Sequence, residues 1–358
     1  MKVVFMGTPQ FAIPSLKMLI QEKYEIACVV TQPDRKKGRH AELTMPPVKE
    51  IAVQHGIRVL QPSSIKSDEV FSELSELKPD IIVTVAYGGI LNKRVLDIPK
   101  FGCINVHASL LPKYRGPAPI QWAIINGEDE TGVTTMLMDE GVDTGKILQS
   151  DSLPLTSDLY FPEVHDKLSE LGAHTLMRTL PLWICGSITP QPQDNAKATY
   201  ARMLTKEDGE INLRKSADDV VNLVRGLNPW PGVYLLIDNG TANDCCDGAD
   251  GENEKLKVLR ANIVSKGDQP DDEIKRNGEI KRNGEIKRDD EIKRNSEIKR
   301  GGFDVGDVIR VSRDGLVVKC GSGAVSITRL QFENGCALGI KECWHNQKCK
   351  HFLLSVTE

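Results

Sequence analysis

The first half of the chain alternates short β-branched apolar runs with longer amphipathic segments, and this pattern restricts the fold more than any other feature. Near-continuous apolar runs, typical of buried strands, occupy residues 3–6, 26–31, 81–86 and 103–106. Helix-like segments lie between them at residues 11–21, 48–55 and 69–77. The alternation predicts an α/β fold with a doubly wound, mostly parallel sheet and helices on both faces. In such a sheet, ligands bind at the carboxyl ends of the strands.

A change of composition near residue 187 indicates a second domain. The chain has 358 residues, which corresponds to roughly two domains of ~150 residues. Residues 188–208 are polar and Pro-punctuated, which predicts a linker that is either wrapped against another surface or mobile. After a helix at residues 217–225, short strands are expected at residues 234–237, 256–263, 307–311, 316–319 and 324–330. They predict a small OB-like β-barrel within residues 209–358, after a first domain at residues 1–187.

A low-complexity repeat interrupts this predicted barrel at about residues 265–302. Within residues 273–300, the unit Glu-Ile-Lys-Arg recurs every six residues with two polar or glycine residues between copies. One Ile in six residues forms no apolar stripe, so the segment cannot bury enough apolar surface to offset its ordering entropy. Its ten basic and seven acidic residues are balanced by three preceding aspartates. We therefore predict a solvated, largely disordered insertion, and a basic RNA-binding segment is the minority alternative.

Composition excludes several classes of protein. No apolar run approaches the ~20 residues of a membrane-spanning helix, so no membrane association is expected. The formal net charge of −4 means that any nucleic-acid partner must bind a local basic patch. Nine scattered cysteines favour a reducing compartment, and the N-terminus shows no signal or transit pattern. We therefore expect a cytoplasmic protein.

Two motif tests argue against a nicotinamide, flavin or metal cofactor. The first strand ends in Gly7-Thr8-Pro9, where only one of the three glycines of a dinucleotide-binding G-x-G-x-x-G turn is present. The cysteines and histidines between Cys343 and His351 do not have the spacing of structural zinc sites, in which pairs of like ligands are two to five residues apart. We expect neither cofactor class and no metal.

The strongest candidate site lies at the end of the strand that begins at residue 103. Asn105 and His107 are two residues apart, so both side chains point to one face at the carboxyl edge of the sheet. Asp143 lies in an acidic Gly-rich turn after a predicted strand at residues 131–137 and is expected to reach His107. An amide, an imidazole and a carboxylate can together stabilise an oxyanion and move a proton in acyl transfer. Taken separately, each residue can equally brace a loop or a turn.

Longer segments identify a resemblance to a known family. Six segments resemble those of enzymes that use 10-formyltetrahydrofolate, namely GTPQFAIPSL, TQPDR, VAYGGIL, INVHASLLPKYRGPAPIQWAI, MDEGVDTGKIL and NPWPG. The resemblance covers residues 1 to about 240 and resumes from about 303 to 358. The Asn-x-His and SLLP motif with a distant Asp marks the wider family, whereas NPWPG and the C-terminal barrel mark its methionyl-tRNA formyltransferase branch.

The resemblance implies a role for each candidate residue. Asn105, His107 and Asp143 would form the catalytic trio of a formyltransferase-type Rossmann-like domain. Residues from three loops would line the folate pocket, namely Tyr87, Gly88, Ile90, Ser109, Leu110, Leu111, Pro112 and Asp139. The loop at residues 32–46 would enter the acceptor stem of a tRNA with the basic residues Arg35, Lys36, Lys37 and Arg39.

The tRNA loop departs from the family pattern at one point. Relatives usually carry further lysines just after the arginine that corresponds to Arg39, whereas this chain has His40-Ala41-Glu42. Basic charge lies earlier instead, from residue 35 to 37. A basic loop is therefore retained, but the direction of its contacts with the acceptor end is left open by the sequence.

The resemblance implies transfer of the formyl group from 10-formyltetrahydrofolate to the α-amino group of methionine on initiator methionyl-tRNA, which prepares this tRNA for translation initiation. Its expected partners are that tRNA and the folate co-substrate, and the expected state is a monomer. One alternative is a formyltransferase for a small amine, such as a purine ribonucleotide or an amino sugar, which would not need the C-terminal barrel. Another is a non-catalytic RNA-binding protein, against which the intact Asn105, His107 and Asp143 argue.

Deletion of residues 273–300 should leave formyl transfer and the melting temperature nearly unchanged. Loop length affects stability only slowly, by about 0.6 kcal/mol per doubling. The deletion variant and the intact protein would be compared for the KM of tRNA and for thermal unfolding. A tenfold rise in KM, worth about 1.4 kcal/mol, would instead identify the repeat as a tRNA-binding element.

Overall fold

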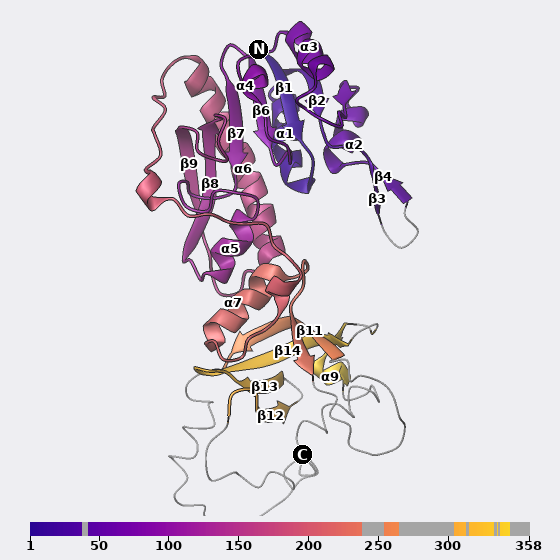
Figure 1. The fold of residues 1–358 in the computed structure, drawn as a ribbon, viewed down its shortest axis with the longest axis vertical. Helices are drawn as coiled ribbons and strands as arrows, with labels where there is room; N and C mark the ends of the chain where they lie inside the picture. Colours follow the sequence, from indigo (N-terminus) through magenta and orange to yellow (C-terminus); the bar gives the residue numbers. More distant parts are fainter. Residues whose placement is uncertain are drawn as a thin grey trace, which may run out of the picture. The chain divides into compact units, whose positions relative to one another are not determined.

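The computed structural model describes residues 1–37, 42–237, 254–264, 304–312, 315–332, 335 and 337–343. These residues form two compact units, one from residues 1–123 and 128–203 and one from residues 124–127 and 204 onward (Figure 1). The repeat at residues 273–300, the pair Cys245-Cys246 and the segment from Trp344 to His351 lie outside the described residues. None of the described helices is long and apolar enough to cross a membrane.

The first unit is built on a seven-stranded sheet with the order β5-β2-β1-β6-β7-β8-β9. The first five strands in this order pair in parallel, whereas β8 and β9 run antiparallel to their neighbours. The strands are β1 (Lys2–Gly7), β2 (Glu25–Val30), β5 (Val59–Leu60), β6 (Ile81–Val85), β7 (Cys103–His107), β8 (Glu130–Leu137) and β9 (Ile147–Pro154). The prediction of a mostly parallel α/β sheet is confirmed.

One face of this sheet is covered by the long helix α6 (Phe161–Ile184), which packs on β8 and β9 and against α1 (Ile13–Gln21) (Figure 1). Gly172 of α6 lies so close to β7 that an added Cβ would be 2.9 Å from Val106. Because strand side chains alternate between faces, Val106 and Ile104 face α6, and Asn105 and His107 face the other side.

The opposite face is covered by α3 (Asp68–Leu77) and α4 (Lys93–Leu96). Val70 and Leu74 of α3 are buried in one core cluster with Cys103 of β7. The sequence starts α3 at a defined point because the Ser67 side chain accepts a hydrogen bond from the backbone N–H of Val70. The carboxyl edge of β7 therefore presents Asn105 and His107 on the side of the sheet that α3 and α4 cover.

Further short elements complete this unit. They are the helices α2 (Pro47–Gln54) and α5 (Pro119–Ile125), the 3-10 turns η1 (Gln10–Ala12) and η2 (Asn195–Lys197), and the hairpin strands β3 (Arg35–Lys37) and β4 (Glu42–Thr44). The last two residues of α5 belong to the second unit. The helices expected at residues 11–21, 48–55 and 69–77 are confirmed by η1 with α1, α2 and α3. The hairpin follows β2 at the carboxyl edge of the sheet.

The second unit combines helices with an antiparallel sheet of order β10-β11-β14-β13-β12, to which β15 adds beside β14. Its elements are η3 (Glu207–Gly209), α7 (Ala217–Leu227), β10 (Tyr234–Ile237), β11 (Glu254–Ile263), β12 (Val308–Ser312), β13 (Gly315–Lys319), β14 (Ala324–Phe332), β15 (Leu338–Gly339) and α9 (Ile340–Cys343). A capping box between Ser216 and Asp219 fixes the start of α7, which packs on β11 and β14. The five strands predicted here are confirmed.

The barrel expected for this region is only partly matched. All strand pairs of the second unit are antiparallel, and β10 and β12 are the two edges of the described sheet. Within the described residues, no strand ladder joins these edges, so the structure shows an antiparallel sheet and no closed barrel. The difference arises because alternating strands specify an antiparallel sheet, whereas closure depends on strand tilt and stagger, which a single sequence does not specify.

Four cysteines have side chains that the structure describes, and none of these four forms a disulfide. Burial raises the pKa of the Cys28 and Cys103 thiols to about 12 and that of Cys320 to about 11. Cys185 is exposed after α6, and a hydrogen bond with the Ser187 hydroxyl lowers the pKa of its thiol. Because the thiolate is the nucleophile, these environments predict different reactivities.

Iodoacetamide at pH 8 should therefore label Cys185 at least about tenfold faster than Cys28, Cys103 or Cys320, since only Cys185 combines exposure with a lowered pKa. Peptide mass spectrometry of the native protein over time would give the four rates. The unfolded protein is the control, because there all four thiols should react at similar rates. Rapid native labelling of Cys103 would contradict the burial described for it.

Candidate active site

The strand β7 and the turn between β8 and β9 bring Asn105, His107 and Asp143 together. The Nδ2 atom of Asn105 is 3.5 Å from Oδ1 of Asp143. The Nδ1 atom of His107 is 3.6 Å from the same oxygen. The side chains of His107 and Asp143 are 7% and 16% exposed, so solvent screens their interaction less than at the surface. An amide, an imidazole and a carboxylate thus share one partly buried cluster.

The second ring nitrogen of His107 defines where the imidazole can exchange a proton. Its Nε2 atom lies 2.9 Å from the backbone carbonyl oxygen of Tyr114. A carbonyl oxygen only accepts hydrogen bonds, so Nε2 carries the proton that it donates. In the neutral ring, Nδ1 is therefore the basic nitrogen, and a proton gained there faces the carboxylate of Asp143.

The turn that carries Asp143 is fixed by local hydrogen bonds. Asp139 Oδ1 accepts hydrogen bonds from the Gly141 N–H at 3.0 Å and from the Thr144 hydroxyl at 2.7 Å. The Gly116 N–H donates to Oδ2 of Asp143 at 2.8 Å, so the carboxylate is held from the loop after β7 as well. At Gly145, an added Cβ would lie 1.7 Å from the Leu137 carbonyl oxygen, which explains why glycine occupies this position.

Unfavourable backbone conformations gather around the same cluster. Among the described residues, five non-glycine residues have positive φ, and three of them, Ala86, Tyr114 and Asp143, belong to the loops at this edge of the sheet. Their φ values are 46°, 59° and 53°. Left-handed conformations of such residues persist only where surrounding contacts enforce them, and they concentrate at functional sites. Their clustering is a second indication of a functional site here.

The loop after β6 contains three of the predicted folate-lining residues. Tyr87 is buried at 3% exposed, whereas Ile90 is 59% exposed. Gly88 has a φ of 80° and no heavy atom within 4 Å of the position that a Cβ would take. The backbone at Gly88 and the side chain of Ile90 are therefore open to a ligand, and Tyr87 anchors the loop in the core.

The loop after β7 contains four more of these residues and is firmly braced. Ser109 is fully buried, and its hydroxyl donates to the Lys113 carbonyl oxygen at 2.7 Å. Leu111 is 7% exposed, and its N–H donates to the Thr134 hydroxyl at 3.2 Å. Leu110 and Pro112 are half-buried. In this structure Ser109 and Leu111 shape the loop, and their side chains have little exposed surface.

Two residues that sequence reasoning missed support these loops. Thr134 of β8 is fully buried and also donates its hydroxyl hydrogen to the Ser109 carbonyl oxygen at 2.7 Å. Thr8 donates its hydroxyl hydrogen to the Tyr87 carbonyl oxygen at 2.9 Å. A threonine inside a strand has no distinguishing signal, but the position of Thr8 directly after the first strand could have marked it as a candidate.

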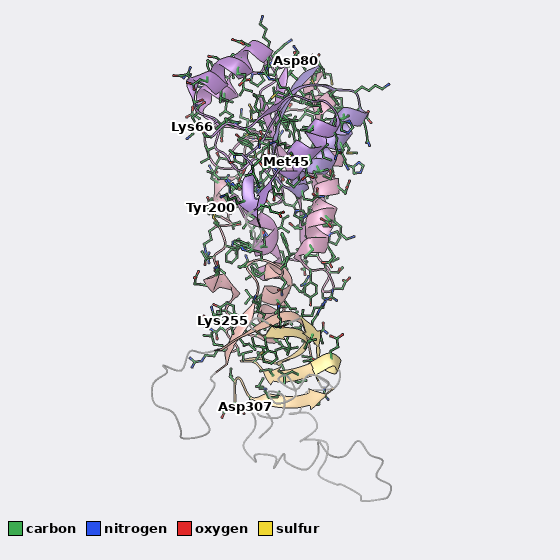
Figure 2. The ribbon with its side chains drawn as sticks, turned by 90° about the vertical axis from the view of Figure 1, so that its right-hand side faces the viewer. Met45, Lys66, Asp80, Tyr200, Lys255 and Asp307 are labelled. Atoms are coloured by element: carbon green, nitrogen blue, oxygen red, sulfur yellow. The ribbon has the colours of Figure 1, made fainter. Side chains whose placement is uncertain are left out.

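The predicted tRNA loop is described in part. Arg35 and Lys36 are exposed on β3, and the backbone of Lys37 ends that strand. Arg39 lies outside the described residues. Leu43 on β4 is 69% exposed. Met45, which follows this strand and is labelled in Figure 2, is 45% exposed. The hairpin thus combines basic and exposed apolar side chains.

The entry to this hairpin is tied to the body of the unit. Asp34 accepts a hydrogen bond from Gln61 at 2.7 Å and pairs with Lys49 at 2.7 Å. The hydrogen bond from Gln61, followed by that from Lys49, holds the pKa of Asp34 below its ordinary value. Gln32 donates through its side-chain amide to the Tyr87 carbonyl oxygen at 3.4 Å. The hairpin therefore leaves the sheet from an anchored base.

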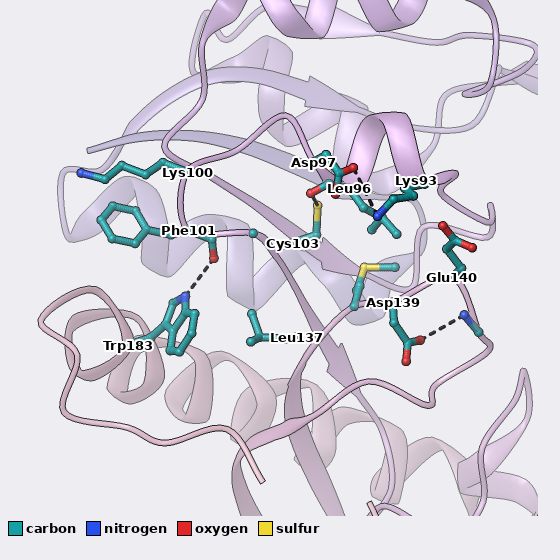
Figure 3. Close-up of a pocket in the computed structure, with 13 residues that line it drawn as sticks. Lys93, Leu96, Asp97, Lys100, Phe101, Cys103, Leu137, Asp139, Glu140 and Trp183 are labelled. Atoms are coloured by element: carbon teal, nitrogen blue, oxygen red, sulfur yellow. Dashed lines mark hydrogen bonds and ion pairs between the residues drawn. The ribbon is translucent and has the colours of Figure 1, made fainter. Parts of the chain in front are cut away.

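A cavity of about 670 Å³ lies beside the amino end of β7, four residues from His107 (Figure 3). It contains only Asp139 of the predicted site residues and none of the catalytic trio. Lys93, Lys100 and Asp97 give it mixed charge, and Trp183 closes one side by donating its indole N–H to the Phe101 carbonyl oxygen at 2.8 Å. The cavity brings together no set of groups comparable to Asn105, His107 and Asp143.

Comparison with protein families matches both parts of the chain. Residues 1–180 match the family model described as "Formyl transferase". Residues 203–348 match the model described as "Formyl transferase, C-terminal domain". The two matches together cover the cluster of Asn105, His107 and Asp143, the hairpin and the antiparallel sheet.

Curated relatives match nearly the whole chain. A protein of Acetivibrio thermocellus named methionyl-tRNA formyltransferase is 45% identical over 347 residues, which are 96% of this chain and 97% of that protein. A protein of Geobacter sulfurreducens with the same name is 41% identical over 333 residues, which are 93% of this chain and 90% of that protein.

Solved structures with a similar fold are more distant in sequence. An N-formyltransferase from Helicobacter canadensis, in complex with folinic acid and dTDP-3-aminofucose, has a TM-score of 0.60 at 16% identity and covers 91% of this chain and 98% of its own. HypX from Aquifex aeolicus has a TM-score of 0.58 at 14% identity, and the match spans 97% of this chain but only 49% of HypX. These likenesses concern the fold.

Proposed function

The chain belongs to the methionyl-tRNA formyltransferase family, and on this premise we propose that Asn105, His107 and Asp143 transfer the formyl group of 10-formyltetrahydrofolate to initiator methionyl-tRNA. The acceptor is the α-amino group of the methionine that the tRNA carries. The observation that carries this proposal is the convergence of Asn105 Nδ2 and His107 Nδ1 on Oδ1 of Asp143. The three groups supply a donor, a proton carrier and a charge partner at one point.

The residues around the trio fit a folate co-substrate. A folate has an apolar ring system with polar edges, and Ile90 and Val142 expose 59% and 42% of their surface in the two loops that flank the trio. Open backbone at Gly88 allows a ring to approach the chain closely. We propose that Tyr87, Gly88, Ile90, the loop at residues 109–112 and Asp139 hold the co-substrate, which supplies the activated formyl group.

The acceptor amine needs little help from a base to become a neutral nucleophile. A free α-amino group titrates near 7.7, so a useful fraction is already neutral at cellular pH. The larger task is to place this amine against the formyl carbon and to stabilise the charge that develops on the formyl oxygen. Asn105 can donate a hydrogen bond to that oxygen through Nδ2, while Asp143 keeps the amide in position.

His107 is suited to move the proton. Its Nδ1 atom can take the proton that the amine loses as the new C–N bond forms. Asp143 stabilises the resulting imidazolium across 3.6 Å. His107 can then return this proton to the nitrogen that leaves as the old C–N bond breaks, which restores the neutral ring. Because Nε2 stays protonated and hydrogen-bonded to the Tyr114 carbonyl oxygen, the imidazole ring does not need to flip between the two steps.

Two basic surfaces support binding of a tRNA. On the hairpin, Arg35 and Lys36 are exposed, and we propose that they act with Lys37 and Arg39 on acceptor-stem phosphates. In the second unit, further exposed basic residues lie on β11, β14 and β12, namely Lys255, Lys257, Arg260, Arg329 and Arg310. An overall charge of −4 makes such local clusters the means by which this chain can attract RNA.

We propose the following organisation for the whole chain. Residues 1–187 form the catalytic domain, residues 188–208 the linker, and residues 209–358 a tRNA-binding domain of OB-like barrel type with the repeat inserted in one of its loops. The antiparallel sheet and the family match over residues 203–348 support the last assignment. A cytoplasmic monomer is proposed because one chain carries both the trio and the basic sheet and because the described cysteines are free.

His107→Ala or Asn105→Ala should lower kcat by about 100-fold or more, because each change removes a group that acts in the transition state. The assay measures formyl transfer to charged initiator tRNA, with a small amine such as an amino sugar as the alternative acceptor. His174→Ala, which changes an exposed histidine of α6, is the control and should behave like the wild type. Near-normal activity of either variant, or a preference for the small amine, would refute the proposal.

Combined Arg35→Ala and Arg39→Ala changes should raise the KM for tRNA and reduce the slope of log KM against log salt by roughly one per lost phosphate contact. The affinity for the folate should not change, since neither residue lies in the proposed folate loops. Lys66→Ala, which removes an exposed positive charge before α3, is the matched control. An unchanged salt slope together with weaker folate binding would place this hairpin at the other substrate.

A further inference from the structure

Residues 193–201, here called the strap, connect both loops that surround the trio. This segment belongs to the predicted linker and runs along the outside of the first unit, where Tyr200 is labelled in Figure 2 and is 64% exposed. Its backbone is held at the far end, where Ala201 donates through its N–H to the Arg115 carbonyl oxygen at 2.7 Å. The strap has few buried side chains, yet several of its polar groups bond to the loops near the trio.

Gln193 is the central contact of the strap. Its side-chain amide donates to the Asp143 carbonyl oxygen at 2.8 Å and to the Gly145 carbonyl oxygen at 2.7 Å. Its Oε1 atom accepts a hydrogen bond from Nε of Arg115 at 2.9 Å. Both donors of the amide are therefore used on the turn that carries Asp143, and the acceptor is used on the loop after β7.

Thr199 forms hydrogen bonds with the loop that contains Tyr114, the hydrogen-bond partner of His107. Its hydroxyl oxygen accepts a hydrogen bond from the Tyr114 N–H at 2.8 Å, and its carbonyl oxygen accepts one from the Arg115 N–H at 2.9 Å. Tyr114 has a φ of 59°, and its carbonyl oxygen is the acceptor for Nε2 of His107. Thr199 thus fixes the residue that orients the imidazole.

These contacts explain how two strained residues keep their conformations. Asp143 and Tyr114 both have the left-handed backbone that non-glycine residues avoid. Such a conformation persists only where the surroundings enforce it. Gln193 holds the carbonyl groups on both sides of Thr144, and Thr199 holds the amide of Tyr114. Without them, both backbones can relax and move the carboxylate and the imidazole partner.

We propose that Gln193 and Thr199 are positioning residues for formyl transfer and that the strap forms part of the active-site construction. The inference rests on the proposed function, because it concerns the rate of that reaction. Gln193 sets the position of the Asp143 carboxylate, and Thr199 sets the ring of His107 through Tyr114. Neither residue needs to touch a substrate in order to affect the rate, since displacement of a reacting group by about 1 Å can lower a rate by about 100-fold.

Gln193→Ala should lower kcat by about 10-fold to 100-fold and leave the KM for the folate within about twofold of the wild-type value. Gln193→Glu should cause a similar loss, because it keeps the acceptor for Arg115 but cannot donate to the two carbonyl oxygens. The second variant keeps the test decisive if the first does not fold. Gln191→Ala is the matched control, since the Gln191 amide donates only to the nearby Thr189 carbonyl oxygen.

A double-mutant cycle distinguishes positioning from general damage to the fold. If Gln193 acts through Asp143, then Gln193→Ala should lower kcat by less than about twofold in an Asp143→Asn background. A residue with a merely structural role would lower kcat by the same factor in both backgrounds. Single-turnover measurement at high enzyme concentration gives access to the slow variants, and thermal unfolding verifies that each is folded.

The second arm of the test concerns Thr199. Thr199→Val removes the hydroxyl but keeps the backbone bonds, and it should lower kcat about tenfold. Thr199→Ser restores the hydroxyl and should recover the wild-type rate.

The outcomes separate the two proposals. If the wild type forms formyl-methionyl-tRNA and His107→Ala does not, but Gln193→Ala and Gln193→Glu match the wild type, the positioning role is wrong and the proposed function stands. An equal loss in the wild-type and Asp143→Asn backgrounds would also overturn it. If the wild type transfers no formyl group to the tRNA, the proposed function itself fails.

Discussion

The carboxylate of Asp143 is the group on which the construction of the site depends. Its Oδ1 atom is approached by the Asn105 amide and the His107 imidazole, and its Oδ2 atom accepts a hydrogen bond from the Gly116 N–H. The side chain therefore links β7, the loop after it and the turn between β8 and β9. A charge in this partly buried position interacts strongly with its partners, so a small displacement of the carboxylate would disturb the proton transfer proposed for His107.

The direction of β8 explains why a returning turn is needed to bring this carboxylate to Asn105 and His107. Because β8 is antiparallel to β7, its last residues lie beside the amino end of β7, and the Met138 N–H donates to the Cys103 carbonyl oxygen at 2.8 Å. The turn that follows must therefore run back along β7 to bring Asp143 to His107. The left-handed backbone of Asp143 and the close packing of Gly145 against Leu137 accommodate this return.

A second network connects the carboxyl ends of three parallel strands. Thr8 after β1 and Gln32 after β2 both donate to the carbonyl oxygen of Tyr87 after β6. Tyr87 begins the loop proposed to hold the folate, and the hairpin proposed to contact tRNA begins three residues after Gln32. Both substrate loops are thus anchored at one point of the sheet. This arrangement follows from the parallel pairing of β2, β1 and β6, which brings their carboxyl ends to one edge.

The alternation of apolar and amphipathic segments in the first half was sufficient to predict the mostly parallel sheet and its early helices. Short apolar runs after residue 233 were sufficient to predict five strands of the second unit. The spacing of Asn105 and His107 was sufficient to place both on one face of a strand, because side-chain direction has a period of two. Whether a barrel closes could not be derived, since strand pairing across a sheet depends on tilt and stagger that local sequence does not encode.

The contacts of Asp143, Gln193 and Thr199 were decided by tertiary structure alone. Gln193 lies 50 residues from the turn that it holds, and Thr199 lies 85 residues from Tyr114. A glutamine and a threonine are common in any polar, Pro-punctuated linker. Nothing in the sequence therefore marked Gln193 and Thr199 as contacts of the site. By itself, the sequence determined the main strands of both units and the residue types that could perform the chemistry, but it did not mark β3, β4, β5, β9 or β15. Only the folded chain decided which distant polar groups meet, because such contacts depend on the path of the backbone and not on local propensity.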